Sequence, residues 1–250
     1  MESKPETDPL RIYLKGSFRH GRQALFKNLD LTLEAGQWTC LLGSSGVGKS
    51  TLLKLLAGLH TGGEFTGEIR ASDGQPISSR IAYMAQSDLL FPWLSVYDNV
   101  VLGQSLRGES ENNERAHELI CQVGLEAHRN KRPHQLSGGM RQRVALARTL
   151  MEDTPLVLLD EPFSALDTRT RREMQELAFR LLHNKTVLLV THDAAEALRL
   201  SQTMLVMSEA GLTDHDIDAG EPLRQFTDDR FVTSQSRLLI QLNQVNGADA

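Results

Sequence analysis

Residues 43–51 read GSSGVGKST, in which three glycines precede Lys49, Ser50 and Thr51 at the spacing G-x-x-x-x-G-K-[ST]. Glycines allow backbone N–H groups to turn toward a phosphate, which a Cβ would obstruct. Lys49 then places a cation between the β- and γ-phosphates of a nucleotide, and Ser50 offers its hydroxyl to Mg²⁺. The segment therefore predicts a nucleotide-phosphate site. Its members are Gly43, Ser44, Ser45, Gly46, Val47, Gly48, Lys49, Ser50 and Thr51.

Two acidic residues follow the apolar segment LVLL at residues 156–159. Ligands of α/β proteins bind at the carboxyl ends of such strands. We expect Asp160 to contact Mg²⁺, directly or through water, and Glu161 to orient and deprotonate an attacking water. The alternative is a solvated strand end with a helix-capping acid, which the upstream phosphate loop disfavours.

Gln86 and His192 also follow apolar strands, RIAYMA and TVLLV respectively. The amide of Gln86 could ligate Mg²⁺ or sense a γ-phosphate, and His192 would reach the same edge of a parallel sheet. A lone histidine is often structural, and a lone glutamine is often an ordinary loop residue. Both therefore count as site candidates only together with the phosphate loop and the acidic pair.

The segment LSGGMRQR, residues 136–143, is a second candidate phosphate-binding element. Ser137 has the residue type of a helix N-cap, and Gly138 and Gly139 leave backbone N–H groups open to an anion. The following helix is apolar on one face, so packing would anchor it. Two phosphate-binding elements in one chain imply two sites in a symmetric pair of chains.

The elements that must position these residues follow from hydrophobic periodicity. Predicted strands cover residues 11–16, 29–33, 38–42, 67–71, 79–86, 156–159 and 186–190. Predicted helices cover residues 50–58, 112–124 and 169–183. Apolar strands that alternate with helices indicate a parallel sheet covered on both faces. Residues 87–153 read as a mostly helical insertion between strands of this sheet.

The composition is that of a globular protein, with 40% hydrophobic and 24% charged residues among 250. A net charge of −5 argues against nucleic acid as a partner. Cys40 and Cys121 show neither pairing nor metal-ligand spacing, so we expect core residues of a reduced, intracellular protein. No signal peptide and no run of roughly 18 apolar residues is present, so we expect a soluble chain that meets a membrane only through a partner.

In chain order, six segments resemble the motifs of the nucleotide-binding subunit of ABC (ATP-binding-cassette) transporters. They are GSSGVGKS, Gln86, LSGGMRQR, LVLLDE, SALD at residues 164–167, and His192. The resemblance covers residues 10 to about 208, and the signature LSGGM is specific to this family among phosphate-loop proteins. It implies an α/β fold: a phosphate-loop ABC ATPase with a RecA-like parallel-sheet core, an N-terminal antiparallel β subdomain and an inserted α-helical subdomain. We expect a single domain over residues 10–240, a helical insertion over about 87–153, and flexible ends at 1–9 and 241–250.

The resemblance also implies ligands and roles. ATP and Mg²⁺ are expected, in a head-to-tail dimer where one chain's phosphate loop and the other's Ser137, Gly138 and Gly139 clamp the same ATP. The implied catalytic residues are Glu161, His192, Lys49 and Gln86, with His192 on the γ-phosphate, and the implied Mg²⁺ residues are Ser50, Gln86 and Asp160. The family stacks adenine on an aromatic residue roughly two dozen positions before the phosphate loop, which points to Phe18. A core phenylalanine at a strand end is the alternative for Phe18.

An apolar cluster follows Gln86 in SDLLFPWLSVYDNV, residues 87–100. It could pack the core of the insertion or dock a helix of a partner. In the family this region receives the membrane subunit, so a transmembrane permease is expected to dock near Phe91 and Trp93. The other implied partners are a second copy of the chain and, indirectly, a periplasmic or extracellular solute-binding protein. The implied location is peripheral, on the cytoplasmic face of the inner (plasma) membrane.

The implied function is the ATP-hydrolysing subunit of a multi-subunit importer of a small solute. The lack of a long heptad insertion argues against a DNA-repair ATPase, and a single cassette with acidic net charge argues against a translation factor. The ATPase of an exporter with a separate permease is the remaining alternative. The resemblance alone suggests hydroxymethylpyrimidine, a thiamine precursor, as the solute, with nitrate, sulfonate or taurine as alternatives. We expect no large regulatory domain after the cassette.

Overall fold

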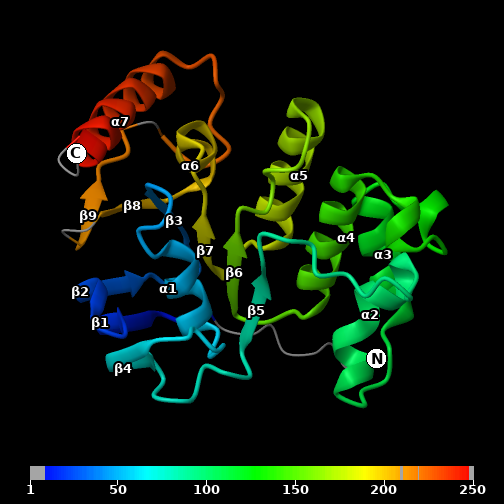
Figure 1. Ribbon diagram of the computed structural model, residues 1–250. Coiled ribbons are helices and arrows are strands. Elements are labelled where there is room, and N and C mark those ends of the chain that lie inside the picture. Colours follow the sequence, from blue (N-terminus) through cyan, green and yellow to red (C-terminus); the bar gives the residue numbers. More distant parts are fainter. Residues whose placement is uncertain (1–8, 209–210, 219, 248–250) are drawn as a thin grey trace. The chain divides into compact units, whose positions relative to one another are not determined.

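Figure 1 shows the computed structural model, which describes residues 9–208, 211–218 and 220–247. The chain divides into two compact units. Among the described residues, the first unit comprises those up to Ile81, Pro155–Asp160 and those from Asn184 onward, and the second comprises Ala82–Thr154 and Glu161–His183. The second unit therefore includes the helical insertion expected from the sequence together with residues 161–183.

An antiparallel sheet lies in the N-terminal part of the first unit. Its strands β1 (Ile12–His20), β2 (Gln23–Leu33) and β4 (Glu64–Ala71) are arranged in the order β2-β1-β4. Buried leucines alternate with polar residues along β2, as expected for a strand with one face on a core. The predicted antiparallel subdomain is confirmed.

A mainly parallel sheet forms the centre of the first unit. The strands β3 (Trp38–Gly43), β6 (Leu156–Asp160), β7 (Thr186–Val190) and β8 (Thr203–Ser208) run parallel in the order β6-β7-β3-β8. Strand β9 (Gly211–His215) pairs antiparallel with β8. Every residue of β6 and β7 is buried, which explains why both strands are almost wholly apolar in sequence. The predicted parallel-sheet core is confirmed.

Three helices belong to the first unit: α1 (Lys49–Leu56), α6 (Ala194–Leu200) and α7 (Asp229–Gly247). Helix α7 contacts α6 and β8 (Figure 1). Its buried residues Phe231, Ser234 and Leu238 recur at helical spacing, so one face of the helix packs. Residues 241–247, which the sequence led us to expect in a flexible end, continue this helix. The expected flexible end at 1–9 lies almost wholly outside the described residues.

Helices dominate the second unit. They are α2 (Val96–Leu106), α3 (Asn113–Gln122), α4 (Gly138–Met151) and α5 (Thr168–Leu181), with the 3₁₀ turns η1 (Glu126–His128) and η2 (Pro133–Gln135). Strand β5 (Ile81–Met84) crosses a boundary of the division, because Ile81 is assigned to the first unit and its other residues to the second. Helices α2, α3 and α4 pack on one another (Figure 1). The predicted α-helical subdomain is confirmed.

The two cysteines differ in environment. Cys40 is buried in β3, as expected, and its burial raises the pKa of its thiol far above the usual range. Cys121 is exposed, so its assignment to the core was wrong. It occupies the outer face of α3, whose buried face is formed by Ala116, Leu119 and Ile120.

Among the described residues, no helix is both long enough and apolar enough to cross a bilayer.

Candidate functional site

Three parallel strands bring the predicted site residues of the first unit to one edge of the sheet. Strand β7 lies between β3 and β6, and both Leu41 and Asp160 stand opposite Val190. The phosphate loop follows β3, Asp160 ends β6, and His192 follows β7 two residues after Val190. Because parallel strands share the direction of their carboxyl ends, these groups meet at the same edge.

The phosphate loop has a conformation that requires glycine. Gly43, Gly46 and Gly48 have φ angles of 155°, 87° and 112°, which L-residues rarely adopt. At Gly43 space is limiting as well, since a Cβ would lie 2.4 Å from the carbonyl oxygen of Met207. Gly48 is the N-cap of α1 and provides no side-chain cap, so the first N–H groups of the helix are not occupied by a capping side chain.

Lys49 is held inside this loop. Its side chain is 8% exposed, and Nζ donates hydrogen bonds to the carbonyl oxygens of Gly43 and Ser44, both at 2.8 Å. A cation, turned glycines and a helix N-terminus at one place suit a triphosphate. The loop therefore fits the phosphates of ATP.

Ser50 and Asp160 form the neighbouring oxygen pair. Ser50 Oγ donates to Asp160 Oδ1 at 3.3 Å, and Asp160 is 3% exposed. A hydroxyl and a buried carboxylate beside a phosphate loop are the donor set that Mg²⁺ prefers. The pair fits that ion.

The second unit consists of two chain segments, and Glu161 is the first residue of the later one, Glu161–His183. Its φ of 48° places a non-glycine residue in the left-handed region. Gln86 Nε2 donates to Glu161 Oε2 at 3.0 Å, so the structure brings these two predicted residues together. The carbonyl oxygen of Glu161 accepts from Ser164 Oγ at 3.0 Å, within the predicted SALD segment.

Gln142 on α4 is a site residue that sequence reasoning missed. It is 4% exposed, and its Nε2 donates to the carbonyl oxygen of Pro162 at 2.9 Å and lies 3.5 Å from that of Glu161. The helix that carries the second phosphate-binding element thereby holds the backbone of Glu161. The available signal was a long polar side chain among the mostly apolar buried residues of α4.

The second phosphate-binding element has the predicted local structure. Ser137 is the N-cap of α4, and its Oγ accepts from the Met140 N–H at 3.3 Å. Ser137 and Gly138 are exposed. A Cβ at Gly138 would meet nothing nearer than 3.9 Å, so packing within this chain does not demand glycine there.

His192 is exposed directly after β7, and the adjacent Asp193 caps α6 by accepting from two backbone N–H groups. The place of His192 agrees with a group that faces a ligand beyond the sheet edge. Its proposed contact with a γ-phosphate stays a prediction.

Phe18 is placed differently from the expectation. It is 1% exposed, and its ring stacks on Phe26 at a centroid distance of 5.7 Å, so it offers adenine no open face. This agrees with the alternative of a core phenylalanine. The exposed neighbour His20 meets the edge of the Phe18 ring at 5.0 Å and stands opposite Gln23 in the β1–β2 pairing. The sequence offered His20 as an alternative, because it is a second aromatic ring two residues after Phe18 and nearer to the turn between β1 and β2.

A cavity of about 370 Å³ adjoins the phosphate loop within the first unit. Its lining consists of Gln23, Ala24, Leu25, Phe26, Lys27, Gly46 and Val47. Strand β2 and the loop thus form one concave surface, on the side where Gln23 pairs with His20.

The expected docking residues Phe91 and Trp93 are exposed on the segment between β5 and α2. Trp93 is 64% exposed, and its ring lies edge-on to that of Phe91 at 5.2 Å. The buried Asn99 accepts from the Phe91 N–H at 2.9 Å and donates to its carbonyl oxygen, so the backbone below this aromatic pair is fixed.

A cation in a glycine loop between a strand and a helix, beside a buried aspartate on a nearby strand, defines a phosphate-loop nucleoside triphosphatase. Residues 26–164 match the ABC transporter family, and the chain belongs to that family. It is an ATP-binding subunit of the ABC transporter type, with the ATPase activity of that family.

Relatives and solved structures agree. An uncharacterised ABC transporter ATP-binding protein of Haemophilus influenzae is 48% identical over 227 residues, which are 88% of this chain and 93% of the relative. The aliphatic sulfonates import ATP-binding protein SsuB 1 of Rhodococcus jostii is 43% identical over 212 residues, 84% of each chain. The bacterial ABC transporter cassette MJ0796, solved as a dimer bound to ADP and Pi, superposes with a TM-score of 0.70 at 30% identity, over 86% of this chain and all of that one. None of these similarities supports a thiamine precursor as the solute.

Proposed function

We propose that this chain powers a multi-subunit importer, in which it hydrolyses ATP on the cytoplasmic face of the plasma membrane and drives a separate permease. The exposed Phe91–Trp93 pair carries the proposal, because it follows Gln86 by only a few residues, and Gln86 bonds the proposed general base Glu161. A partner bound at these rings would lie a short distance along the chain from the site of hydrolysis. Named sulfonate importers among the relatives support the direction of transport.

The proposed chemistry divides among the residues already placed. The phosphate loop and Lys49 bind the triphosphate, while Ser50 and Asp160 hold Mg²⁺, with the amide oxygen of Gln86 as a further ligand. Bound Mg²⁺ supplies neutralisation of charge on the β- and γ-phosphates. Glu161 orients the attacking water and accepts its proton, and the Gln86 amide keeps the carboxylate in place.

The adenine base is proposed to stack on His20 instead of Phe18. Only an exposed ring offers a face to a base, and the ring of His20 is exposed. The cavity formed by β2 and the phosphate loop gives the base a concave surface in the same unit. The T-shaped contact of the His20 ring with the Phe18 ring, at a centroid distance of 5.0 Å, helps to hold the His20 ring in place.

Two copies of the chain are proposed to share each ATP, head to tail. The exposed Ser137 and Gly138 support this, because glycine at 138 serves no packing need within the chain and would allow close approach of a phosphate from outside it. The MJ0796 cassette was solved as a dimer. His192 and the SALD segment, Ser164–Asp167, are proposed to lie at this dimer interface.

The solute is proposed to be a small organic anion, with aliphatic sulfonates as the first class to test. Several relatives at 40–43% identity over 84–96% of this chain are named sulfonate importers. A solute-binding protein would deliver the solute to the permease and not to this chain.

Affinity purification of the tagged chain from gently solubilised host membranes tests the proposal. We expect a polytopic permease in stoichiometric amount with the wild type and its loss with Trp93→Ala. Leu106→Ala is the matched control, because Leu106 is also a strongly exposed apolar residue and lies on α2 of the same unit. Isolated ATPase activity should be unchanged in both variants.

Two outcomes would reject the proposal. Recovery of the permease with Trp93→Ala would show that Trp93 is not needed for docking. Purification of the wild type with no membrane protein at all would contradict the proposed role in a transporter. If a permease is found, the solute class is tested by uptake of a radiolabelled alkanesulfonate. Uptake is compared between cells that lack this chain and the same cells after the chain has been restored.

A further inference from the structure

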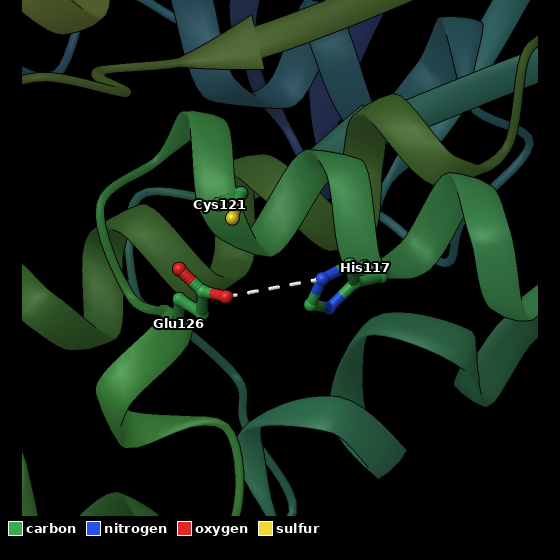
Figure 2. A group of neighbouring side chains, drawn as sticks. All are labelled: His117, Cys121 and Glu126. Atoms are coloured by element: carbon green, nitrogen blue, oxygen red, sulfur yellow. Dashed lines mark ion pairs between the residues drawn. The ribbon is translucent and has the colours of Figure 1, made fainter.

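A cluster of three potential metal ligands lies on the second unit and includes none of the residues given a role above. His117 and Cys121 are one helical turn apart on α3, and Glu126 begins the turn η1 that follows the helix. Residues at i and i+4 project from the same face of a helix. Figure 2 shows both side chains on one side of α3, with the Glu126 carboxylate facing them.

The ligand atoms converge. The imidazole nitrogen, thiol sulfur and carboxylate oxygen all lie within 4.8 Å of one another, and His117 Nε2 is 3.9 Å from Glu126 Oε1 (Figure 2). Zinc bonds of about 2.0–2.3 Å would set ligand atoms roughly 3.3–3.8 Å apart in a tetrahedron. All three side chains are exposed, so small rotations about their own torsions can close the difference.

The backbone that presents Glu126 is held firmly. Helix α3 ends at Gln122 with Val123 as its C-cap, and the next residue, Gly124, has a φ of 69°. The N–H groups of Gly124 and Leu125 donate to the carbonyl oxygens of Cys121 and Ile120 at 2.8 and 2.9 Å. This is the Schellman arrangement of a helix C-terminus. Leu125 is fully buried, so the residue directly before Glu126 is anchored in the core. The chain reversal therefore returns Glu126 to the face that carries His117 and Cys121.

The donor set selects a class of ion. A nitrogen, a sulfur and an oxygen donor suit zinc and neighbouring transition metals, whereas Mg²⁺ and Ca²⁺ prefer oxygen alone. Three protein ligands on an open surface leave a fourth position for water.

We propose that His117, Cys121 and Glu126 bind one divalent transition-metal ion, with zinc as the ion that this donor set fits best. The site shares no residue with the phosphate loop, Asp160, Glu161 or the LSGGM segment. An ion bound there would therefore not compete with ATP for any ligand.

Cobalt titration of the untagged, metal-stripped and nucleotide-free full chain tests this. A thiolate ligand gives Co²⁺ a charge-transfer absorption in the near ultraviolet, which reports sulfur coordination directly. We expect this absorption to saturate near one equivalent and to disappear when Zn²⁺ is added. Cys40 cannot supply it, because it is buried and its thiol pKa is strongly raised.

Variants identify the ligands. Cys121→Ser should abolish the absorption, and His117→Ala and Glu126→Gln should each weaken cobalt binding by at least about tenfold. His134→Ala is the matched control, an exposed histidine of the same unit, and should bind as the wild type does. Circular dichroism should show unchanged folding, since all three ligands are exposed. Absence of the absorption in the wild type, or equal absorption in wild type, His117→Ala and Glu126→Gln, would overturn the proposal.

Discussion

Glu161 shows how a single residue can be both strained and firmly held. A non-glycine residue in the left-handed region costs about 1–2 kcal/mol. The carbonyl oxygen of Glu161 accepts from Ser164, its carboxylate accepts from Gln86, and Gln142 bonds the next carbonyl. These contacts hold both the backbone and the carboxylate of Glu161. The carboxylate that is proposed to orient water is therefore in position before a substrate binds.

Lys49 provides the first prediction. Its ammonium bonds two loop carbonyls, so Lys49→Ala removes both the loop's internal bonds and its cation. Loss of a charged hydrogen bond to phosphate should raise the Kd for ATP by about 10- to 100-fold. Calorimetry measures this, with Lys54→Ala as the control, because Lys54 is an exposed cation on the same helix. Equal ATP affinity in the two variants would refute the role of Lys49.

His20 and Phe18 provide the second prediction. His20→Ala should weaken ATP binding by about 1–3 kcal/mol, the worth of one base stacked on an aromatic ring. Binding of inorganic tripolyphosphate, which has no base, should not change. Phe18→Leu should instead lower the free energy of unfolding by about 1 kcal/mol and leave ATP affinity nearly intact, because Phe18 is a core residue. If Phe18→Leu weakened ATP binding and His20→Ala did not, Phe18 and not His20 would be the base-stacking residue.

At the scale of elements, α4 connects three functional segments of the second unit. Its N-terminus carries Ser137, its buried face carries Gln142, and its outer residues Arg141 and Arg148 reach the segment that leads to Phe91. Arg141 Nε donates to Asp88 Oδ2 at 2.8 Å, and Arg148 donates to the carbonyl oxygen of Asp88, also at 2.8 Å. Helix α4 thus contacts both Asp88, three residues before Phe91, and the backbone of Pro162, directly after Glu161.

Gln142 tests this connection as a positioning residue. Gln142→Leu should lower kcat while leaving the Kd for ATP unchanged, because the change moves the water-orienting carboxylate and not the phosphate loop. It should also lower the free energy of unfolding by about 1–3 kcal/mol, since buried carbonyls lose their donor. Steady-state kinetics and urea unfolding measure both effects, with the exposed Gln122→Leu on α3 as control. A variant with lower stability but an unchanged kcat would show that Gln142 is only structural.

Sequence patterns anticipated some elements far better than others. The phosphate loop and the strands β6 and β7 were placed within a residue or two, because their signals are local: fixed motif spacing and unbroken apolar runs. Strands β8 and β9 and helix α7 were not predicted. The apolar residues of α7 lie on more than one face, since Val232, Leu239 and Ile240 are exposed beside the buried Phe231 and Leu238, so its periodicity was weak.

The site was predicted in part for a similar reason. Residue types and spacing identified Lys49, Asp160, Glu161 and Gln86, but they could not show that Gln86 bonds Glu161, a contact between residues 75 positions apart. The burial of Phe18 depends on how β1 packs, and the cluster of His117 and Cys121 depends on a helical face. Cysteine spacing alone gave no metal motif, whereas the offset of four between His117 and Cys121 on a predicted helix would have placed both side chains on one face.

At the scale of the whole molecule, the division into units separates the chemistry. Lys49, Ser50, Asp160 and His192 belong to the first unit, whereas Gln86, Glu161 and the LSGGM segment belong to the second. One of the places where the chain passes from one unit to the other is the peptide bond between Asp160 and Glu161. The groups proposed for hydrolysis therefore come from the segments of both units, and the second phosphate-binding element is proposed to serve the ATP of a partner chain.

Head-to-tail sharing of ATP between two copies of the chain predicts a stable dimer when ATP is bound but not hydrolysed. The mass of Glu161→Gln in solution, measured by light scattering with excess MgATP, tests it most directly. Hydrolysis should nearly stop, by about 10²- to 10⁴-fold, so the bound ATP should hold a stable dimer. Adding Ser137→Arg should return the protein to a monomer that still binds ATP, whereas Asn130→Arg, an exposed site in the same unit, should leave the dimer intact. A Glu161→Gln protein that binds ATP and remains monomeric would contradict the shared site.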